Sequence, residues 1–199
     1  MVAAPLLPDF PGKAWALSQA PLVRGAAAFA GLLGVFCSVM VYVATRREQW
    51  SFAQTGLKFF STTFLLGCAS VLAVSTLDPR LGAVGEPSLL QSVIIAMALF
   101  KLVFEGHALT YATDRRTTAL KRMALVMRGE LRGVTGLRFV LLVIGGLLLP
   151  TGLMMNRFPE SAWMPVTFLI LAVLLVGELS ERYLFFRAAP ASRMPGGLR

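Results

Sequence analysis

The chain has 199 residues, of which 56% are hydrophobic and only 15% are charged, and its mean hydropathy is +0.71. Soluble domains are about 45–50% apolar and about 25% charged, so this composition excludes an ordinary water-soluble domain. The net charge of +9 would suit nucleic acid, but the basic residues lie between apolar runs, which is typical of membrane proteins. With two cysteines and one histidine, the chain by itself cannot hold a four-thiolate iron–sulfur cluster or a bis-histidine haem.

Five apolar runs are long enough to cross a membrane as helices. A hydrocarbon core of about 30 Å needs about 20 mostly apolar residues in helical form. The third run carries Lys101, Glu105 and His107 in its second half. We keep it as a span because the two most basic stretches otherwise fall on opposite sides of the membrane. We therefore predict an all-α, polytopic transmembrane bundle of five helices, at residues 25–44, 59–77, 87–109, 139–156 and 161–177.

The distribution of basic residues predicts how this bundle is oriented. Four Lys and Arg residues fall on the side of the N-terminus and fourteen on the side of the C-terminus, while Lys101 lies within the membrane. Because cytoplasmic loops carry the excess of Lys and Arg, we expect the N-terminus outside and the C-terminus in the cytoplasm. Residues 1–20 are then an outer arm, residues 21–187 form the bundle, and residues 188–199 form a flexible cytoplasmic tail.

Residues 114–133, between the third and fourth runs, are predicted to form an amphipathic helix. Leu120, Met123, Met127 and Leu131 recur at helical spacing, and basic residues occupy most of the remaining circumference. Such a helix lies along the cytoplasmic interface. Two compatible roles stay open: a helix held among lipid headgroups by snorkelling arginines, or a docking platform for an acidic cytoplasmic partner.

Several ionisable residues lie within the spans or at their ends, where each charge costs roughly 2.5–3.5 kcal/mol on insertion scales. Lys101 and Glu105 are four residues apart on one helix face and can pair, and for this reason we expect the third span to be the most buried of the five. One explanation is structural: a buried salt bridge, with the other groups snorkelling. The other is a polar pocket or proton path at the cytoplasmic side, formed by Lys58, Lys101, Glu105, His107, Arg138 and Glu178.

Two stretches of the chain resemble a known family. Residues 42–50 read Tyr-Val-Ala-Thr-Arg-Arg-Glu-Gln-Trp and are followed by Thr55, Lys58-Phe59-Phe60, Thr63 and Gly67. Residues 177–186 read Gly-Glu-Leu-Ser-Glu-Arg-Tyr-Leu-Phe-Phe. Together with Arg138 and the pair Gly145-Gly146, these motifs resemble the membrane anchor subunits of the dimethyl sulfoxide reductase type. The resemblance covers about residues 24–190 and corresponds to the later five helices of that family.

This resemblance implies a haem-free anchor subunit in the bacterial inner membrane, with no substrate active site of its own. Its partners are then an iron–sulfur subunit and a molybdopterin catalytic subunit, which carry those cofactors, while this chain binds only quinone, as an exchangeable ligand. His107 can hydrogen-bond a quinone carbonyl or shuttle a proton, although a lone histidine at a helix end can equally be an interfacial residue. We expect the iron–sulfur subunit to dock on the cytoplasmic side, at Arg46, Arg47, Trp50, Arg115, Lys121, Arg122 and Arg182.

Two other function classes remain open. The chain can be a structural or accessory membrane subunit that only holds a larger complex together. A small transporter is favoured only by the Lys101–Glu105 pair, since the halves of the chain show no repeat symmetry and no helix pair broken by Gly or Pro. Molybdenum and non-haem iron in the purified complex distinguish an anchor from an accessory subunit.

Overall fold

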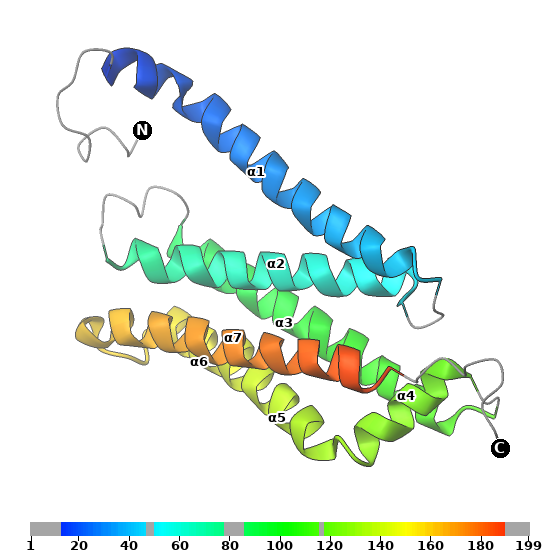
Figure 1. Cartoon of the computed structure of the whole chain (residues 1–199). Coiled ribbons are helices and arrows are strands. Elements are labelled where there is room, and N and C mark those ends of the chain that lie inside the picture. The colour runs from blue at the N-terminus through cyan, green and yellow to red at the C-terminus, as the bar shows by residue number, and fades with distance from the viewer. Residues whose placement is uncertain (1–12, 47–49, 78–85, 116–117, 190–199) are drawn as a thin grey trace.

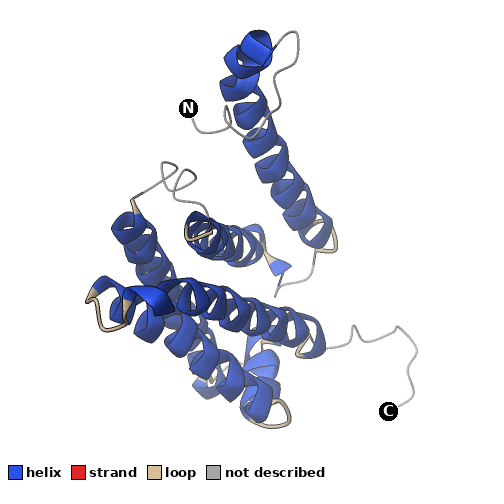
Figure 2. Ribbon diagram, turned by 90° about the vertical axis from the view of Figure 1, so that its left-hand side faces the viewer, coloured by secondary structure: helices blue, strands red, loops and turns tan. Residues whose placement is uncertain are grey.

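The computed structural model describes residues 13–46, 50–77, 86–115 and 118–189, and within these ranges every regular element is helical (Figure 2). The longer helices are α1 (Lys13–Val43), α2 (Phe52–Ser75), α3 (Pro87–Thr110), α4 (Ala119–Arg128), α5 (Arg132–Val143), α6 (Leu149–Met154) and α7 (Trp163–Arg187). Two 3-10 turns, η4 (Tyr111–Thr113) and η6 (Glu160–Ala162), and one π-helical turn, η5 (Ile144–Leu148), complete the elements.

Five helical segments are long and apolar enough to cross a membrane, which confirms the predicted polytopic bundle. They are Leu22–Val43, Phe52–Ser75, Pro87–Thr113, Arg132–Met154 and Glu160–Arg187. The fourth segment is assembled from α5, η5 and α6. The segments alternate in direction, so that α1 begins at one end of the bundle and α7 finishes at the other (Figure 1).

The helices extend beyond the apolar runs from which they were predicted. α2 begins at Phe52 rather than at residue 59, because Ser51 caps it and its Oγ accepts from the Gln54 N–H at 3.5 Å. α5 begins at Arg132 rather than at residue 139, and α7 ends at Arg187 rather than at residue 177. An apolar run marks only the part of a helix in hydrocarbon, whereas charged residues are good helix formers that continue the backbone hydrogen bonds.

Two predicted segments outside the spans have different bounds in the structure. α1 begins at Lys13, within the expected arm of residues 1–20. The rest of that arm, residues 1–12, lies outside the described ranges, as do residues 190–199 of the expected tail. The helix predicted at residues 114–133 is shorter, because Thr118 caps the start of α4 and Gly129 ends it. The chain then turns from the interface into α5.

Four helical segments pack around a common apolar core, and α1 lies at its periphery. The core residues are at most 2% exposed and come from α2, α3, α5, α6 and α7; they include Leu65, Ala69, Ile94, Leu142 and Leu174. Among the described side chains of α1 only Val39 is buried, and α1 diverges from the bundle towards its N-terminal end (Figure 1). The outward-facing apolar side chains of all five segments suit a lipid environment.

The expectation that the third span is the most buried is wrong. In the most apolar stretch of the third segment, 22% of the residues are buried, whereas 33% are buried in the corresponding stretches of the fourth and fifth segments. The ionisable residues do not single out α3, because buried charged side chains from α5 and α7 share the same interior.

The fourth segment contains a π-helical turn, η5, whose backbone lies close to α3 and α7. The Leu149 N–H bonds to the Ile144 carbonyl, five residues back. Pro150 follows directly and has no N–H, so it cannot donate the backbone hydrogen bond that an α-helix would have at this position. The wider turn therefore lies next to a position where a helical hydrogen bond is already absent. Gly145 and Gly146 in this turn are both buried and face α7 and α3. Small residues of this kind let membrane helices approach closely.

Candidate functional site

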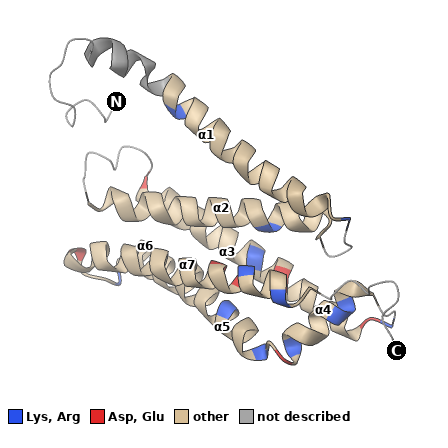
Figure 3. Ribbon diagram, viewed as in Figure 1, with Lys and Arg blue, Asp and Glu red and all other residues tan. Residues whose placement is uncertain are grey.

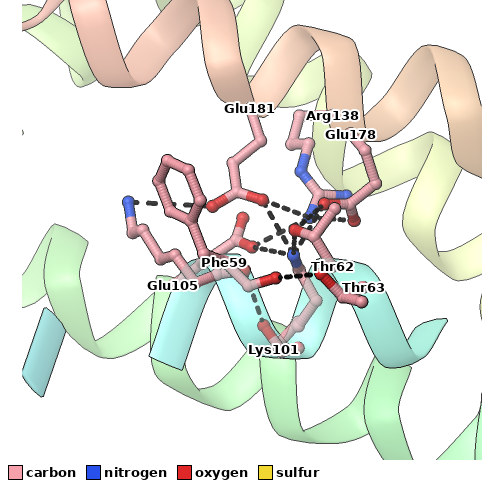
Figure 4. A network of polar contacts seen from close by, with 10 residues as sticks. Phe59, Thr62, Thr63, Lys101, Glu105, Arg138, Glu178 and Glu181 are labelled. Atoms are coloured by element: carbon pink, nitrogen blue, oxygen red, sulfur yellow. Dashed lines mark hydrogen bonds and ion pairs between the residues drawn. The ribbon is translucent and has the colours of Figure 1, made fainter. Parts of the chain in front are cut away.

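A network of buried charged side chains joins four helices near the end of the bundle that carries α4 (Figures 3 and 4). Its five innermost charged residues are at most 8% exposed. The network consists of Lys58 and Thr62 on α2, Lys101 and Glu105 on α3, Arg138 on α5, and Glu178 and Glu181 on α7.

Lys101 lies at the centre of the network. Its Nζ donates to Glu178 Oε2 at 2.7 Å and to Glu181 Oε2 at 2.8 Å, so that α3 is bound to α7 through two carboxylates. The same Nζ donates to the Thr62 hydroxyl at 3.0 Å, and that hydroxyl donates to Glu178 Oε2. Glu105, the partner expected from the spacing, is farther away, at 3.9 Å from Lys101 Nζ.

Arg138 joins the remaining carboxylate to the network. Its Nη2 donates to Glu105 Oε1 at 2.8 Å and to Glu178 Oε1 at 3.0 Å. The guanidinium lies against Gly177 of α7, where an added Cβ would be in ordinary van der Waals contact with Arg138 Nη1, at 3.5 Å. Nε and Nη1 of Arg138 are buried and have no hydrogen-bond partner among the described residues.

Lys58 completes the charge balance at the edge of the network. Its Nζ lies 3.9 Å from Glu181 Oε1, and its side chain is 13% exposed, more than any other charged member. With every group ionised, three cations face three carboxylates. Buried charges are tolerated when they are paired and hydrogen-bonded in this way.

Five of the six candidate residues from the sequence meet in this network, and His107 does not. Sequence reasoning missed Thr62 and Glu181, and it assigned Lys101 to the wrong principal carboxylate. A signal for Glu181 was present, because Glu178 and Glu181 are three residues apart and share a helix face once α7 is extended past residue 177. No comparable signal pointed to Thr62, since threonine is common in membrane helices.

His107 lines a narrow pocket between the end of the network and α4. The pocket volume is about 70 Å³, and Lys58 lies in its wall. The apolar face predicted for the amphipathic segment forms one side of it, through Leu120, Met123 and Met127. The other lining residues are Gln54, Phe104, His107, Ala108, Tyr111, Ala124 and Phe185. His107 itself is exposed and packs its ring edge-on against Tyr111, with centroids 5.5 Å apart.

The two motif-bearing stretches of the sequence meet in a cluster of aromatic rings beside this pocket. Tyr42 contacts Trp50, Phe59 and Phe185 with ring centroids 5.4–5.5 Å apart, and Trp50 stacks on Phe185 at 5.6 Å. Arg182 lies over the Phe59 ring, 3.7 Å from its centroid. The cluster therefore fastens the end of α1 to α2 and α7. Trp50 and Arg182, both expected at a docking surface, make these contacts within the chain.

The other residues expected at the docking surface have different degrees of exposure. Arg46, Arg115 and Arg122 are exposed. The Lys and Arg positions of the ribbon gather at the end of the bundle that carries α4 (Figure 3). Lys121 is half-buried and its Nζ donates to the Asp114 carbonyl at 2.6 Å. Arg47 lies outside the described residues.

Comparison with known proteins identifies the family of this chain. Among the described residues, no cluster of His, Cys, Asp and Glu is arranged to hold a metal ion. No curated protein and no solved structure matches the chain. The family model described as DMSO reductase anchor subunit (DmsC) matches residues 16–187, which include α2 to α7, the charge network and both motif-bearing stretches. The chain therefore belongs to the DMSO reductase anchor subunit family and is a multi-pass membrane anchor of a complex of that type.

Proposed function

We propose that this anchor subunit exchanges electrons with membrane quinone and binds an iron–sulfur subunit, both at the end of the bundle that carries α4. The observation that carries the proposal is the position of Lys58, which lines the pocket beneath α4 and also pairs with Glu181 of the buried network. A quinone gains or loses protons together with electrons, so it needs a polar path leading away from its oxygens. The network supplies such a path between four helices.

The chemistry of the pocket lining suits a quinone ring. Lys58, Gln54, His107 and Tyr111 offer hydrogen-bond donors for carbonyl oxygens, and Phe104 and two methionines offer apolar walls. Small-molecule pockets usually measure about 300–1,000 Å³, and this one has only about 70 Å³. Entry of a ring therefore requires α4 to move away from α3. α4 is a short amphipathic helix of 10 residues, which makes it the mobile wall in this proposal.

The test of quinone exchange uses His107, because this residue lines the pocket but makes no contact in the charge network. His107→Leu removes a donor, and we expect kcat/KM for quinol oxidation by the assembled complex to fall about tenfold, as for one lost hydrogen bond to substrate. His107→Gln keeps a donor and should retain most of the activity. Ser92→Ala, near the other end of α3, is the matched control. Unchanged activity in His107→Leu would contradict a quinone site in this pocket.

The proposed docking of the iron–sulfur subunit rests on charge and exposure. The apolar face of α4 is directed into the pocket, so its basic residues face outward, and Arg122 and Arg128 are exposed. Arg46 and Arg115 are exposed at the same end. Such a surface complements an acidic patch on a partner and steers its approach. By the positive-inside rule this end faces the cytoplasm of a bacterium, with the N-terminus outside.

Changing Arg115, Arg122 and Arg128 to Glu should release the iron–sulfur and molybdopterin subunits from inverted membrane vesicles, in which the cytoplasmic face is outermost. Each change replaces attraction by repulsion at an exposed position, so we expect more than about 90% loss of bound partner at physiological salt. Lys121 is left intact because it bonds to the Asp114 carbonyl within the chain. The control changes Arg24 and Arg157, exposed at the opposite end, to Glu. Retention of the partner by the triple variant, or its presence inside the vesicles, would overturn the docking side.

A purely structural role as an accessory subunit is favoured by one observation, which is that the buried charges are balanced within the chain. In that case the network only holds four helices together. Molybdenum and non-haem iron in the complex purified with this chain support the redox anchor. A partner set that contains neither metal leaves the accessory role.

A further inference from the structure

A second pocket lies where the end of α7 meets α4 and the turn that leads into α5 (Figure 1). Its volume is about 230 Å³. It shares no lining residue with the pocket beneath α4, and no member of the charge network contributes to it. Because it is formed by helix ends with basic residues, beside the apolar spans, it lies near the boundary between membrane and water.

Part of the lining is apolar and is brought together by the turn after α4. α4 ends at Arg128, and the Leu131 N–H then donates to the Val126 carbonyl at 3.0 Å, so that the chain turns back over the end of α4. Leu131 and Val126 both line the pocket, and Ala188, which is 2% exposed, lines it from the end of α7. The pocket therefore offers contacts for an apolar group as well as for a polar one.

Two arginines from different helices line the same pocket. Arg122 belongs to α4, and Arg187 is the last residue of α7. Both are exposed, and neither forms an ion pair with a carboxylate of the described residues, in contrast to Lys101 and Arg138 of the buried network. A guanidinium presents its N–H donors in a planar fork that matches the oxygens of a phosphate group. Two of them on one pocket point to an anionic ligand.

The charge of the lining selects among anions. The two arginines and one carboxylate, Glu130, give the pocket a net charge of +1. A phosphodiester carries a single negative charge and balances this lining. A phosphate monoester carries about −1.5 to −2 charges near pH 7 and would place excess negative charge beside Glu130. Basic pockets between membrane helices bind the head groups of acidic lipids in this way.

The outer face of α7 continues from the pocket as an apolar surface. Tyr183 and Leu179 precede Arg187 by four and eight residues, so the three side chains share one face of the helix. Tyr183 is 51% exposed and Leu179 is 60% exposed. A ligand held at Arg187 therefore has an apolar surface directly below it on which an acyl chain can lie. An anionic phospholipid combines the phosphodiester with such chains.

We propose that this pocket binds the phosphodiester of an anionic membrane phospholipid, with Arg122 and Arg187 donating to its oxygens and the acyl chains lying along α7. The lipid then ties α4 to the end of α7. This inference goes beyond the function proposed above. Arg122 also belongs to the proposed docking surface, so the test uses the purified chain without peripheral subunits and rests on Arg187.

Native mass spectrometry of the full-length chain in detergent micelles provides the test, because it resolves the number of lipids bound to each protein molecule. The chain is titrated separately with phosphatidylglycerol and with phosphatidylcholine. We expect the first phosphatidylglycerol to bind at least about tenfold more tightly than phosphatidylcholine. Millimolar inorganic phosphate should not displace it, because free phosphate has no apolar body. Displacement would identify free phosphate as the ligand and contradict the lipid.

Variants then connect this binding to the pocket. Arg187→Gln should weaken phosphatidylglycerol binding about tenfold, as for one lost charge-assisted hydrogen bond. Arg128→Gln makes the same change of charge at an exposed position outside the lining and should alter binding less than about twofold. Ala189→Phe fills the pocket without changing its charge and should also weaken binding. Glu130→Gln removes the like charge and should tighten it.

Thermal unfolding followed by circular dichroism verifies that each variant is folded. Equal affinity for the two lipids overturns the proposal, and so do equal losses in Arg187→Gln and Arg128→Gln, which would show that the basic end attracts anionic lipid without a site. Full binding by a folded Ala189→Phe variant would likewise exclude the pocket. None of these outcomes bears on quinone exchange beneath α4 or on the release of peripheral subunits.

Discussion

Replacing Arg138 with Leu is expected to destabilise the bundle by about 3–5 kcal/mol, because it leaves buried carboxylates without their cation. Arg138 Nη2 holds both Glu105 and Glu178 at hydrogen-bond distance, and the guanidinium is 1% exposed. Without it, the two lysines of the network face three carboxylates. The measurement is thermal or denaturant unfolding of the purified protein in detergent micelles, followed by circular dichroism.

The matched variant removes one charge of each sign. Arg138→Leu combined with Glu105→Leu leaves two cations and two carboxylates, and we expect it to recover most of the lost stability. Glu105 is the appropriate partner because it bonds to Arg138 at 2.8 Å and lies 3.9 Å from Lys101. Arg157→Leu, at an exposed loop position, should be nearly neutral. If the single and double variants were equally mild, the network would not be a set of coupled buried charges.

Gly146→Ala is expected to destabilise the protein by about 1–3 kcal/mol through overpacking, although alanine is the better helix former. A Cβ at Gly146 would lie 2.5 Å from Ala98 Cβ, a separation at which one of the two backbones must shift. The contact joins the π-helical turn to α3, so the shift also disturbs the packing of Leu142 and Leu174. The same unfolding measurement detects the loss.

The structure supplies both a rescue and a control for this variant. Ala98→Gly removes the atom that the new methyl would meet, so the pair Gly146→Ala with Ala98→Gly should be more stable than Gly146→Ala alone. Gly67, on α2, has nothing within 4 Å of an added Cβ. Gly67→Ala should therefore be neutral or stabilising by up to about 1 kcal/mol. Equal losses at Gly67 and Gly146 would show that helix propensity, and not the contact with Ala98, determines the result.

Several elements of the site could be predicted because they depend on local pattern. The apolar face of α4 was visible from the spacing of Leu120, Met123 and Met127, and these residues do line the pocket beneath it. The shared level of Lys58 and Arg138 along the bundle could be predicted from their places at the ends of apolar runs. A spanning helix rises by a constant distance per residue, so a residue's place in the run gives its position along the helix axis. The aromatic cluster was present only as two motif-bearing stretches. Their contact through Tyr42 and Phe185 could not be derived from either stretch alone.

The sequence by itself determined the all-helical class, the five membrane segments, the amphipathic helix and the family, because hydrophobicity, spacing and motifs are properties of short stretches of chain. Tertiary structure alone decided which charges meet. Lys101 and Glu178 are 77 residues apart, and Arg138 and Glu105 are 33 apart, so their pairing depends on how α7 and α5 face α3. Local spacing favoured the pair Lys101–Glu105, but the packed bundle brings Glu178 and Glu181 closer to Lys101. In a low-dielectric interior the shortest distances govern the ion pairs, and the packing of the helices sets those distances.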